Sequence, residues 1–121
     1  MILPRLALIA ALLAASAVCA HETAGQHGGR VTDAGKFHVE LVARGETVDV
    51  FLSDEGQKPV PAAGFKGTAI LVVGGKPARV PLEPADGNRL TGKAAATLGG
   101  SPKGAVQLTG PDGATASGKF N

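Results

Sequence analysis

From residue 36 onward, hydrophobic and polar residues alternate in short runs that Gly, Pro, Asp and Asn interrupt. Phe37, Val39 and Leu41 fall on one side of the first run, which predicts a half-buried β-strand. The apolar run 68–73 predicts a central strand buried on both sides. No window has the periodicity of an amphipathic helix. About seven short strands are therefore expected, at 37–41, 48–52, 68–73, 78–82, 89–93, 105–108 and 114–120.

The number and spacing of these strands indicate an all-β protein with one small domain at residues 36–121. Short strands with frequent turn signals favour a small antiparallel β-sandwich of the immunoglobulin-like kind, and a small open barrel is the alternative architecture. Residues 21–35 are rich in Gly and polar side chains, and they predict a flexible arm that leads into the first strand.

The first 20 residues have the pattern of a signal peptide. Arg5 supplies the basic start, and residues 6–18 form an apolar run that is too short to anchor the chain across a bilayer. Small residues before the expected cleavage point favour release after Ala20, and cleavage after Ala17 is the second possibility. The sequence therefore predicts an exported, secreted protein.

Cys19 is the one cysteine of the chain, and its place near the cleavage point decides two further expectations. Lipid attachment at Cys19 fits poorly, because the bulky Val18 stands where a small residue is expected. Cleavage after Ala20 would remove Cys19, so the mature protein would have no disulfide and would depend on its core for stability.

Composition and missing motifs exclude several classes of function. Four Phe and no Trp or Tyr are too few for an aromatic platform that stacks nucleic-acid bases, and a net charge of +2 shows no general preference for polyanions or membrane surfaces. There is no G-x-S-x-G nucleophile motif and no Gly-rich phosphate loop that opens a helix. No enzyme activity, nucleic-acid partner or membrane partner of the mature chain is therefore expected.

All three histidines, His21, His27 and His38, lie within 18 residues of one another. Imidazole is a common ligand of Cu(II), Zn(II) and Ni(II). Release after Ala20 would also give His21 a free α-amine beside its ring, and the two nitrogens would form a chelate that suits Cu(II). Unrelated surface histidines in a soluble domain are the alternative interpretation.

A hairpin built on Arg44-Gly45 places two carboxylates side by side. With that turn, Val39 faces Val50 and Leu41 faces Val48 on the core side, while His38 faces Phe51 and Glu40 faces Asp49 on the outer side. Adjacent carboxylates repel each other, and a bound cation or a nearby Arg44 or Lys36 would relieve the repulsion. The candidate metal ligands are therefore His27, His38, His21, Glu40 and Asp49, and the expected ion is Cu(II), with Zn(II) and Ni(II) as alternatives.

Two segments carry a family resemblance: His-Gly-Gly-Arg-Val at 27–31 and Ala-Gly-Lys-Phe-His-Val-Glu-Leu-Val at 34–42. They resemble a small periplasmic β-domain of Gram-negative bacteria that occurs alone and near the N-terminus of adaptor subunits of heavy-metal efflux systems. The similarity continues through 50–54, 58–60 and 84–90. It implies a periplasmic accessory protein for copper or related divalent ions, in which His27 and His38 match the recurrent histidines.

A weaker similarity leads to a different expectation. Residues 53–64 resemble the turn and strand of carboxypeptidase-regulatory-like surface β-sandwiches, which act as spacers or adhesion modules. The leading hypothesis is a periplasmic metal-binding accessory protein that buffers an ion or passes it to an efflux adaptor or another periplasmic protein. The alternative is an exported structural or protein-interaction module that binds no metal. An enzyme that uses a bound metal for hydrolysis ranks third, because no separate general base is identified.

Overall fold

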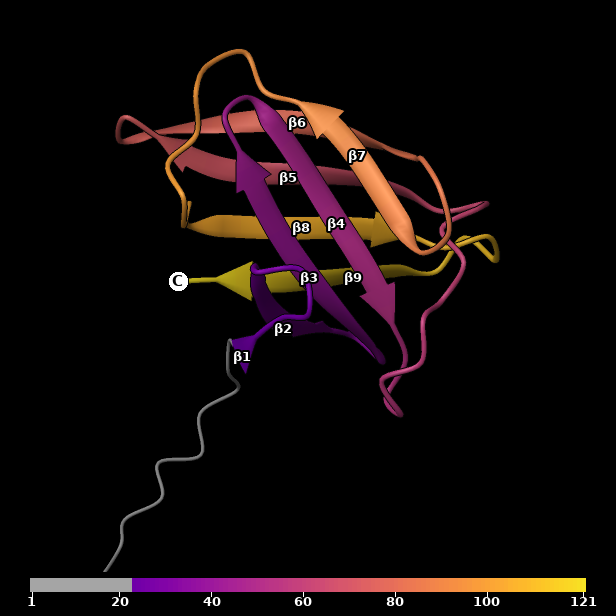
Figure 1. The fold of residues 1–121 in the computed structure, drawn as a ribbon. Helices are drawn as coiled ribbons and strands as arrows, with labels where there is room; N and C mark the ends of the chain where they lie inside the picture. The colour runs from indigo at the N-terminus through magenta and orange to yellow at the C-terminus, as the bar shows by residue number, and fades with distance from the viewer. Residues whose placement is uncertain (1–22) are drawn as a thin grey trace, which may run out of the picture.

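The computed structural model describes residues 23–121, which form nine antiparallel β-strands and no helix (Figure 1). This confirms the all-β class. The predicted signal peptide, both cleavage points, Cys19 and His21 lie outside the described residues. No helix capable of crossing a membrane occurs in the described part of the chain. The strands are β1 (Thr23–Ala24), β2 (Arg30–Ala34), β3 (Phe37–Arg44), β4 (Thr47–Ser53), β5 (Lys66–Val73), β6 (Lys76–Pro84), β7 (Arg89–Lys93), β8 (Gly104–Thr109) and β9 (Thr115–Phe120).

The strands form one hydrogen-bonded order, β1-β2-β3-β4-β7-β6-β5-β8-β9, that curls over on itself. The front layer consists of β1, β2, β3, β4 and β7, and the back layer consists of β5, β6, β8 and β9. Figure 1 shows the strands of the front layer crossing those of the back layer. Strand β6 joins the layers, because it pairs with β5 along most of its length and with β7 at Glu83 and Pro84.

The two ends of this curled sheet come close to each other where β2 lies against β9. Gly118 of β9 makes the approach possible, since a Cβ atom there would lie 2.9 Å from Cγ2 of Thr32. Thr32 itself is buried, with 7% of its surface exposed. The space between the layers is therefore closed on this side by side-chain packing between two strands that do not pair with each other.

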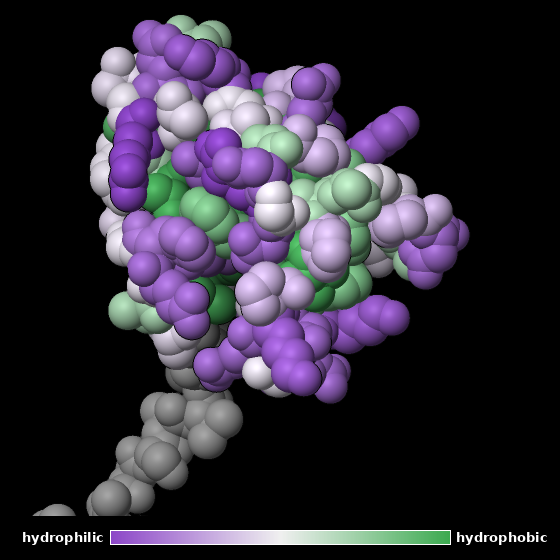
Figure 2. All heavy atoms as spheres, turned by 45° about the vertical axis from the view of Figure 1, so that its right-hand side comes forward, coloured by the Kyte–Doolittle hydropathy of each residue, from purple (hydrophilic) through white to green (hydrophobic). Residues whose placement is uncertain are grey.

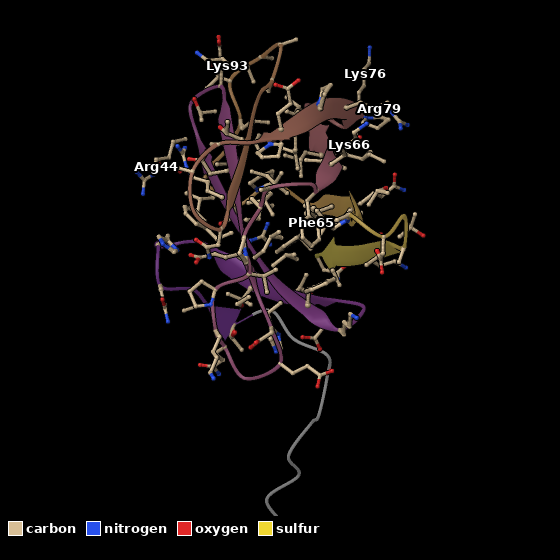
Figure 3. All side chains as sticks on the ribbon, turned by 90° about the vertical axis from the view of Figure 1, so that its right-hand side faces the viewer. Arg44, Phe65, Lys66, Lys76, Arg79 and Lys93 are labelled. Carbon is tan, nitrogen blue, oxygen red and sulfur yellow. The ribbon has the colours of Figure 1, made fainter. Side chains whose placement is uncertain are left out.

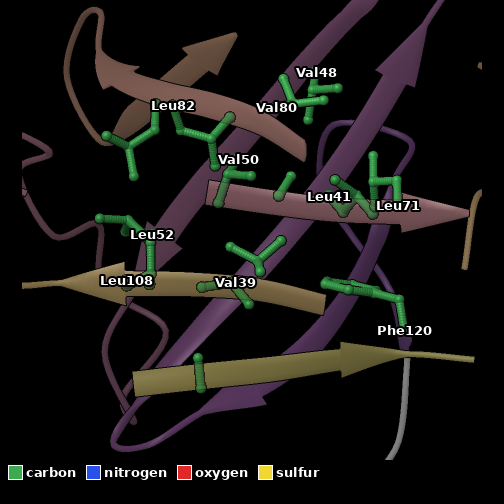
Figure 4. Packing of buried hydrophobic residues seen from close by; sticks show 14 of the residues in the cluster. Val39, Leu41, Val48, Val50, Leu52, Leu71, Val80, Leu82, Leu108 and Phe120 are labelled. Atoms are coloured by element: carbon green, nitrogen blue, oxygen red, sulfur yellow. The ribbon is translucent and has the colours of Figure 1, made fainter. Parts of the chain in front are cut away.

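The hydrophobic core fills the space between the two layers, as Figure 4 shows. Alternate residues of every long strand point inward, as the period of two in the sequence requires. The largest fully buried side chains are Phe120, Leu52, Leu71, Leu90, Leu108, Val39, Val48, Val50, Val80 and Val106. Hydrophilic side chains cover most of the surface in Figure 2, with smaller hydrophobic areas between them.

All seven predicted strands are present at the expected places, and two further strands precede them. Residues 30–34, which the sequence analysis places in the flexible arm, are instead strand β2, paired with β3 along their whole length. The inward side chains of β2 are those of Thr32 and Ala34. A threonine and an alanine give no strong hydrophobic alternation, so the pattern of this strand was not visible in the sequence. The domain therefore extends towards the N-terminus beyond the predicted start at residue 36.

The β3–β4 hairpin differs from the predicted register. Gly45 and Glu46 form the turn, so Glu40 faces Phe51, and Asp49 faces Val42. The predicted pairing of Glu40 with Asp49 is wrong. Gly45 has a φ of 58°, which a glycine adopts at no steric cost, and a two-residue turn with Gly in first position is a common hairpin connection. The predicted turn would have required arginine in that position. Because the shift moves each partner by two residues, the inward and outward faces remain as predicted.

Strand β5 was predicted to be buried on both sides, and this is also wrong. Ala69 and Leu71 are fully buried, but Val72 has 46% of its surface exposed. The back layer therefore has a core face and a free outer face, like an ordinary antiparallel sheet that faces solvent on one side. The apolar run in the sequence is continuous because Ile70 and Val72 lie on that outer face.

Candidate metal site

Glu40 is the one buried acidic residue in the described chain, with 5% of its surface exposed. It lies on the outer side of β3, where the turn before β2 covers it. The amide groups of His27 and Gly29 donate hydrogen bonds of 2.8 and 2.9 Å to its Oε2, and Nδ1 of His27 lies 2.7 Å from its Oε1. A buried carboxylate requires such partners, since burial without them costs several kcal/mol.

These contacts also determine the charge state of Glu40. Burial raises the pKa of its carboxyl group, but the hydrogen bonds from the His27 ring and from the Gly29 and His27 amides, together with the charge of His27, outweigh that effect. The pKa of Glu40 consequently lies below its ordinary value. Glu40 is thus an ionised, acceptor-only group at neutral pH, and its oxygens are already occupied by the turn.

Glycines allow the turn to lie this close to β3. A Cβ atom on Gly25 would overlap the side chain of Glu40, and one on Gly29 would overlap the backbone carbonyl of Leu41. Gly28 has a φ of 80°, which disfavours other residues. The His-Gly-Gly segment and the Phe-His-Val-Glu segment, which carry the family resemblance, are therefore in direct contact through His27, Gly29 and Glu40.

The ring of His27 is fixed on two sides. It stacks on Phe51 with ring centroids 3.6 Å apart and an angle of 4° between the planes, while its Nδ1 contacts Glu40. Because an ionised carboxylate only accepts hydrogen bonds, Nδ1 carries the proton. In the neutral ring, Nε2 is then the nitrogen with a free lone pair. The side chain of His27 is 41% exposed.

His38 lies two residues before Glu40 on β3, and its Nδ1 also contacts a carboxylate. Its Nδ1 lies 2.7 Å from Oδ1 of Asp33, the residue directly opposite it on β2. The side chain of His38 is 32% exposed, so its Nε2 nitrogen is also available to a ligand when the ring is neutral. Pairing of Nδ1 with a carboxylate is the arrangement usually found around histidines that bind metals through Nε2.

Both histidines line the same pocket, which has a volume of about 340 Å³. The pocket lies on the outer face of the front layer, between the turn before β2 and the loop after β4. Other side chains that line it can donate or accept hydrogen bonds; they include Thr23, Gln26, Ser53, Gln57 and Asn88. The structure therefore places two imidazoles at one accessible cavity with both polar and apolar lining.

Asp49 lies outside the lining of this pocket and has other partners. Its Oδ1 accepts hydrogen bonds of 3.1 Å from Nη1 of Arg89 and 2.7 Å from the hydroxyl of Thr91, both on β7. Asp49 and Glu40 are not directly opposite each other, and Arg89 neutralises the charge of Asp49, so the predicted repulsion between the two carboxylates is relieved within the chain. Asp49 does not line the pocket of His27 and His38.

Of the five predicted ligands, the structure thus brings together His27, Glu40 and His38 at one pocket. Glu40 serves as a hydrogen-bond acceptor for His27, Asp49 does not line the pocket, and His21 lies outside the described residues. Within residues 23–121, no three His, Cys, Asp or Glu side chains are grouped so that they could hold a metal ion by themselves.

Sequence reasoning missed Asp33, which orients His38, and Phe51, on which His27 stacks. Both omissions follow from the two errors above, the arm assigned to residues 21–35 and the shifted hairpin. Gly35, with a φ of 58°, and Lys36 form a two-residue turn like that of Gly45 and Glu46. That repeated Gly-plus-charged-residue turn was the signal that could have placed Asp33 opposite His38.

No family model matches the chain, and no curated protein or solved structure matches it. The resemblance to the periplasmic domain of heavy-metal efflux systems therefore stays a prediction that rests on the motifs themselves.

Proposed function

We propose that this protein binds a divalent metal ion, Cu(II) in preference to Zn(II) or Ni(II), through Nε2 of His27 and Nε2 of His38. The observation that carries the proposal is the shared environment of the two rings. Each has its Nδ1 2.7 Å from a carboxylate oxygen, and both line one pocket. A carboxylate at Nδ1 fixes the tautomer and raises the basicity of Nε2, which favours metal binding.

The carboxylates have a supporting role in this proposal. Glu40 accepts three hydrogen bonds from the His27-Gly28-Gly29 turn, so binding a metal through its oxygens would break them. Asp33 orients His38 in the same way from the neighbouring strand. Both residues act as positioning groups, and the proposed protein ligands are imidazoles.

Two imidazoles leave coordination positions for other donors. His21 is the candidate for one of these positions, because it precedes Thr23 by two residues and Thr23 lines the pocket. An α-amine at residue 21 after export would supply a further nitrogen. For a site made of imidazole and amine nitrogens, the Irving–Williams order gives Cu(II) a higher affinity than Ni(II) or Zn(II).

A site with so few protein ligands suits exchange of the ion rather than permanent storage. Water or the side chains of a second protein can occupy the remaining positions, which gives an ion a route between carriers. We therefore propose a periplasmic buffering or hand-over role, with the adaptor of a heavy-metal efflux system as the partner implied by the resemblance.

Calorimetric titration of Cu(II) and Zn(II) into the untagged mature protein tests this function. We expect one equivalent of Cu(II) to bind, and we expect His27→Ala and His38→Ala each to weaken binding at least about tenfold, as for lost ligands or their supporting groups. Asp49→Asn is the matched control, because it removes a predicted ligand that lies outside the pocket. Equal Cu(II) affinity in the wild-type protein and both histidine variants would refute the proposal.

A second candidate function is a structural or protein-interaction module that binds no metal. The contacts of Glu40 favour it, since they give His27 a purely structural role in closing the turn over β3. The two candidates differ at His38, whose contact with the exposed Asp33 closes no buried site. A His38→Ala variant with unchanged stability and reduced Cu(II) affinity supports the metal function, and unchanged values of both support the module.

A further inference from the structure

The small net charge conceals a strong division of charge along the chain. Residues 23–55 contain six Asp or Glu and three Lys or Arg, whereas residues 56–121 contain three Asp or Glu and eight Lys or Arg. Because the first segment forms most of the front layer and the second forms the whole back layer, the fold converts this division into two unlike faces. The expectation that the chain has no membrane preference rests on the total charge alone. It therefore leaves out the difference in charge between the two faces.

Five exposed cations belong to the back layer, and we call them the cationic face: Lys66, Arg79, Lys103 and Lys119 on the outer side of the layer, and Lys76 at the tip of the β5–β6 hairpin. The ladder register places Arg79, Ile70, Ala105 and Lys119 side by side in one row across all four strands. Lys103 lies beside Val72, whose amide donates to its carbonyl. Figure 3 shows the layers from the side, with Lys66, Lys76 and Arg79 on the back layer and Arg44 and Lys93 on the front layer.

The charges of the cationic face are not neutralised within the described chain. No Asp or Glu of residues 23–121 forms an ion pair with any of its five members. Glu83 is the one acidic residue on the back-layer strands, and it lies at the end of β6 that pairs with β7. Asp112, in the turn between β8 and β9, accepts a hydrogen bond from the Ala114 amide.

Apolar side chains lie among these cations. Val72 is the one large hydrophobic residue of the described chain that is exposed, and it lies opposite Pro77 close to the tip of the β5–β6 hairpin. Lys76 stands at that tip, after Gly74 and Gly75. Ile70 is half-buried in the row between Arg79 and Lys119. The hairpin tip therefore combines an exposed apolar side chain with adjacent positive charge.

We propose that the cationic face binds the anionic surface of a phospholipid bilayer, with Val72 at the apolar boundary of the headgroups. Three strand spacings separate Arg79 from Lys119, which spreads the charge over about 14 Å. The five cations line neither the pocket of His27 and His38 nor the other two pockets described by the structure. Charge distributed over an open sheet face suits a plane of phosphates better than a single anion.

An acidic protein is the other class of partner with suitable charge. The observations favour a bilayer, because the one large hydrophobic residue exposed in the described chain, Val72, lies near the hairpin tip among cations. The central part of a protein interface is, in contrast, generally apolar and depleted of charge. Binding through the back layer also leaves the pocket of His27 and His38, on the front layer, open to the surrounding solution.

Co-sedimentation with vesicles tests the proposal. The wild-type protein is mixed with vesicles of phosphatidylglycerol and phosphatidylcholine in equal parts, and with vesicles of phosphatidylcholine alone. We expect binding to the anionic vesicles only, and we expect it to weaken as the salt concentration rises. Each cation near such a surface strengthens binding about fivefold (about 1 kcal/mol). The triple variant Arg79→Gln, Lys103→Gln, Lys119→Gln should therefore bind about a hundredfold more weakly.

A matched control variant separates location from net charge. Lys36→Gln, Lys58→Gln, Lys93→Gln removes the same charge from positions outside the cationic face and should bind within about threefold of the wild-type protein. Val72→Ser should weaken binding without changing its salt dependence. Thermal unfolding of each variant confirms that it is folded before binding is compared.

Three results would overturn the proposal: no binding to the anionic vesicles, equal binding to both kinds of vesicle, or equal losses in the two triple variants. If the vesicles fail but poly-L-glutamate binds with dependence on Arg79, Lys103 and Lys119, the partner is an acidic polypeptide and the bilayer is excluded. None of these results depends on whether His27 and His38 bind a metal.

Discussion

The two outer faces of this small protein use their polar residues in opposite ways. On the front layer, Glu40, Asp33 and Asp49 all have close partners, and a buried carboxylate holds a turn against the sheet. On the back layer, five cations stand in solvent without an acidic partner in the described chain. The charged groups of the front face are thus held by internal contacts, whereas the charge of the back face is available to another surface.

Replacement of Glu40 should show the largest difference in stability between a substitution on the front face and one on the back face. Glu40→Ala leaves the His27 and Gly29 amides without their acceptor in a buried place, and we expect it to reduce the free energy of unfolding by about 2–4 kcal/mol. Arg79→Gln, a matched loss of charge on the back layer, should change it by less than about 0.5 kcal/mol. Urea unfolding measures both. Similar values for the two variants would remove the distinction between the faces.

Gly29→Ala tests the same contact from the other side. The added methyl group would overlap the carbonyl of Leu41 in the neighbouring strand, so the turn must move away from Glu40. We expect a loss of stability of about 1–3 kcal/mol. Gly99→Ala, where a Cβ atom would meet no neighbour, is the control and should change stability by less than about 0.5 kcal/mol. If Gly29→Ala is as stable as Gly99→Ala, the turn is not held in the position described.

The stability that Glu40 contributes on the front face should depend on pH. The pKa of Glu40 is lower in the folded protein than its ordinary value of 4.5, so its ionised form stabilises the fold above that pH. This contribution should be lost as the pH falls below about 4.5 and through the folded-state pKa. The stability difference between the wild-type protein and Glu40→Gln should therefore narrow in acid. A difference that stays constant from pH 7 to pH 3 would contradict the assignment.

The smallest expected change concerns the back layer alone. Replacement of Arg79, Lys103 and Lys119 by Gln together should leave the unfolding midpoint nearly unchanged, because exposed cations without partners contribute little to folding. A clear loss of stability, above about 1 kcal/mol, would show that these side chains have structural partners after all.

Much of the fold could be predicted because its signals are local. Each of the seven predicted strands has an apolar pattern bounded by turn residues, as in Val48, Val50 and Leu52 of β4. These local patterns were sufficient to place the seven strands correctly. Gly74 and Gly75 interrupt the alternating pattern between two of these strands, and both adopt the positive φ that suits glycine in a tight turn. Strand β2 was not predictable in this way, because its inward Thr32 and Ala34 owe their burial to β9, more than 80 residues away in the sequence.

The candidate site could be predicted only in part. The clustering of histidines and the importance of Glu40 were visible in the sequence, but the partners of these residues depended on the hairpin register. A turn moved by one residue replaced the Glu40–Asp49 pair by Glu40 and Phe51. The burial of Glu40 depended on amides of a turn, and no side-chain pattern encodes these. The unequal distribution of charge between residues 23–55 and 56–121 can be counted in the sequence. The net charge of the whole chain does not show it.

Pulsed electron paramagnetic resonance of the Cu(II)-loaded protein tests whether His27 and His38 bind a metal through Nε2. Imidazole ligands give nitrogen modulation from the ring nitrogen that does not bind the metal. We expect His27→Ala and His38→Ala each to remove one imidazole from the Cu(II) spectrum, and we expect Asp49→Asn to leave the spectrum unchanged. The same number of bound imidazoles in the wild-type protein, His27→Ala and His38→Ala would contradict the assignment of these two histidines as ligands.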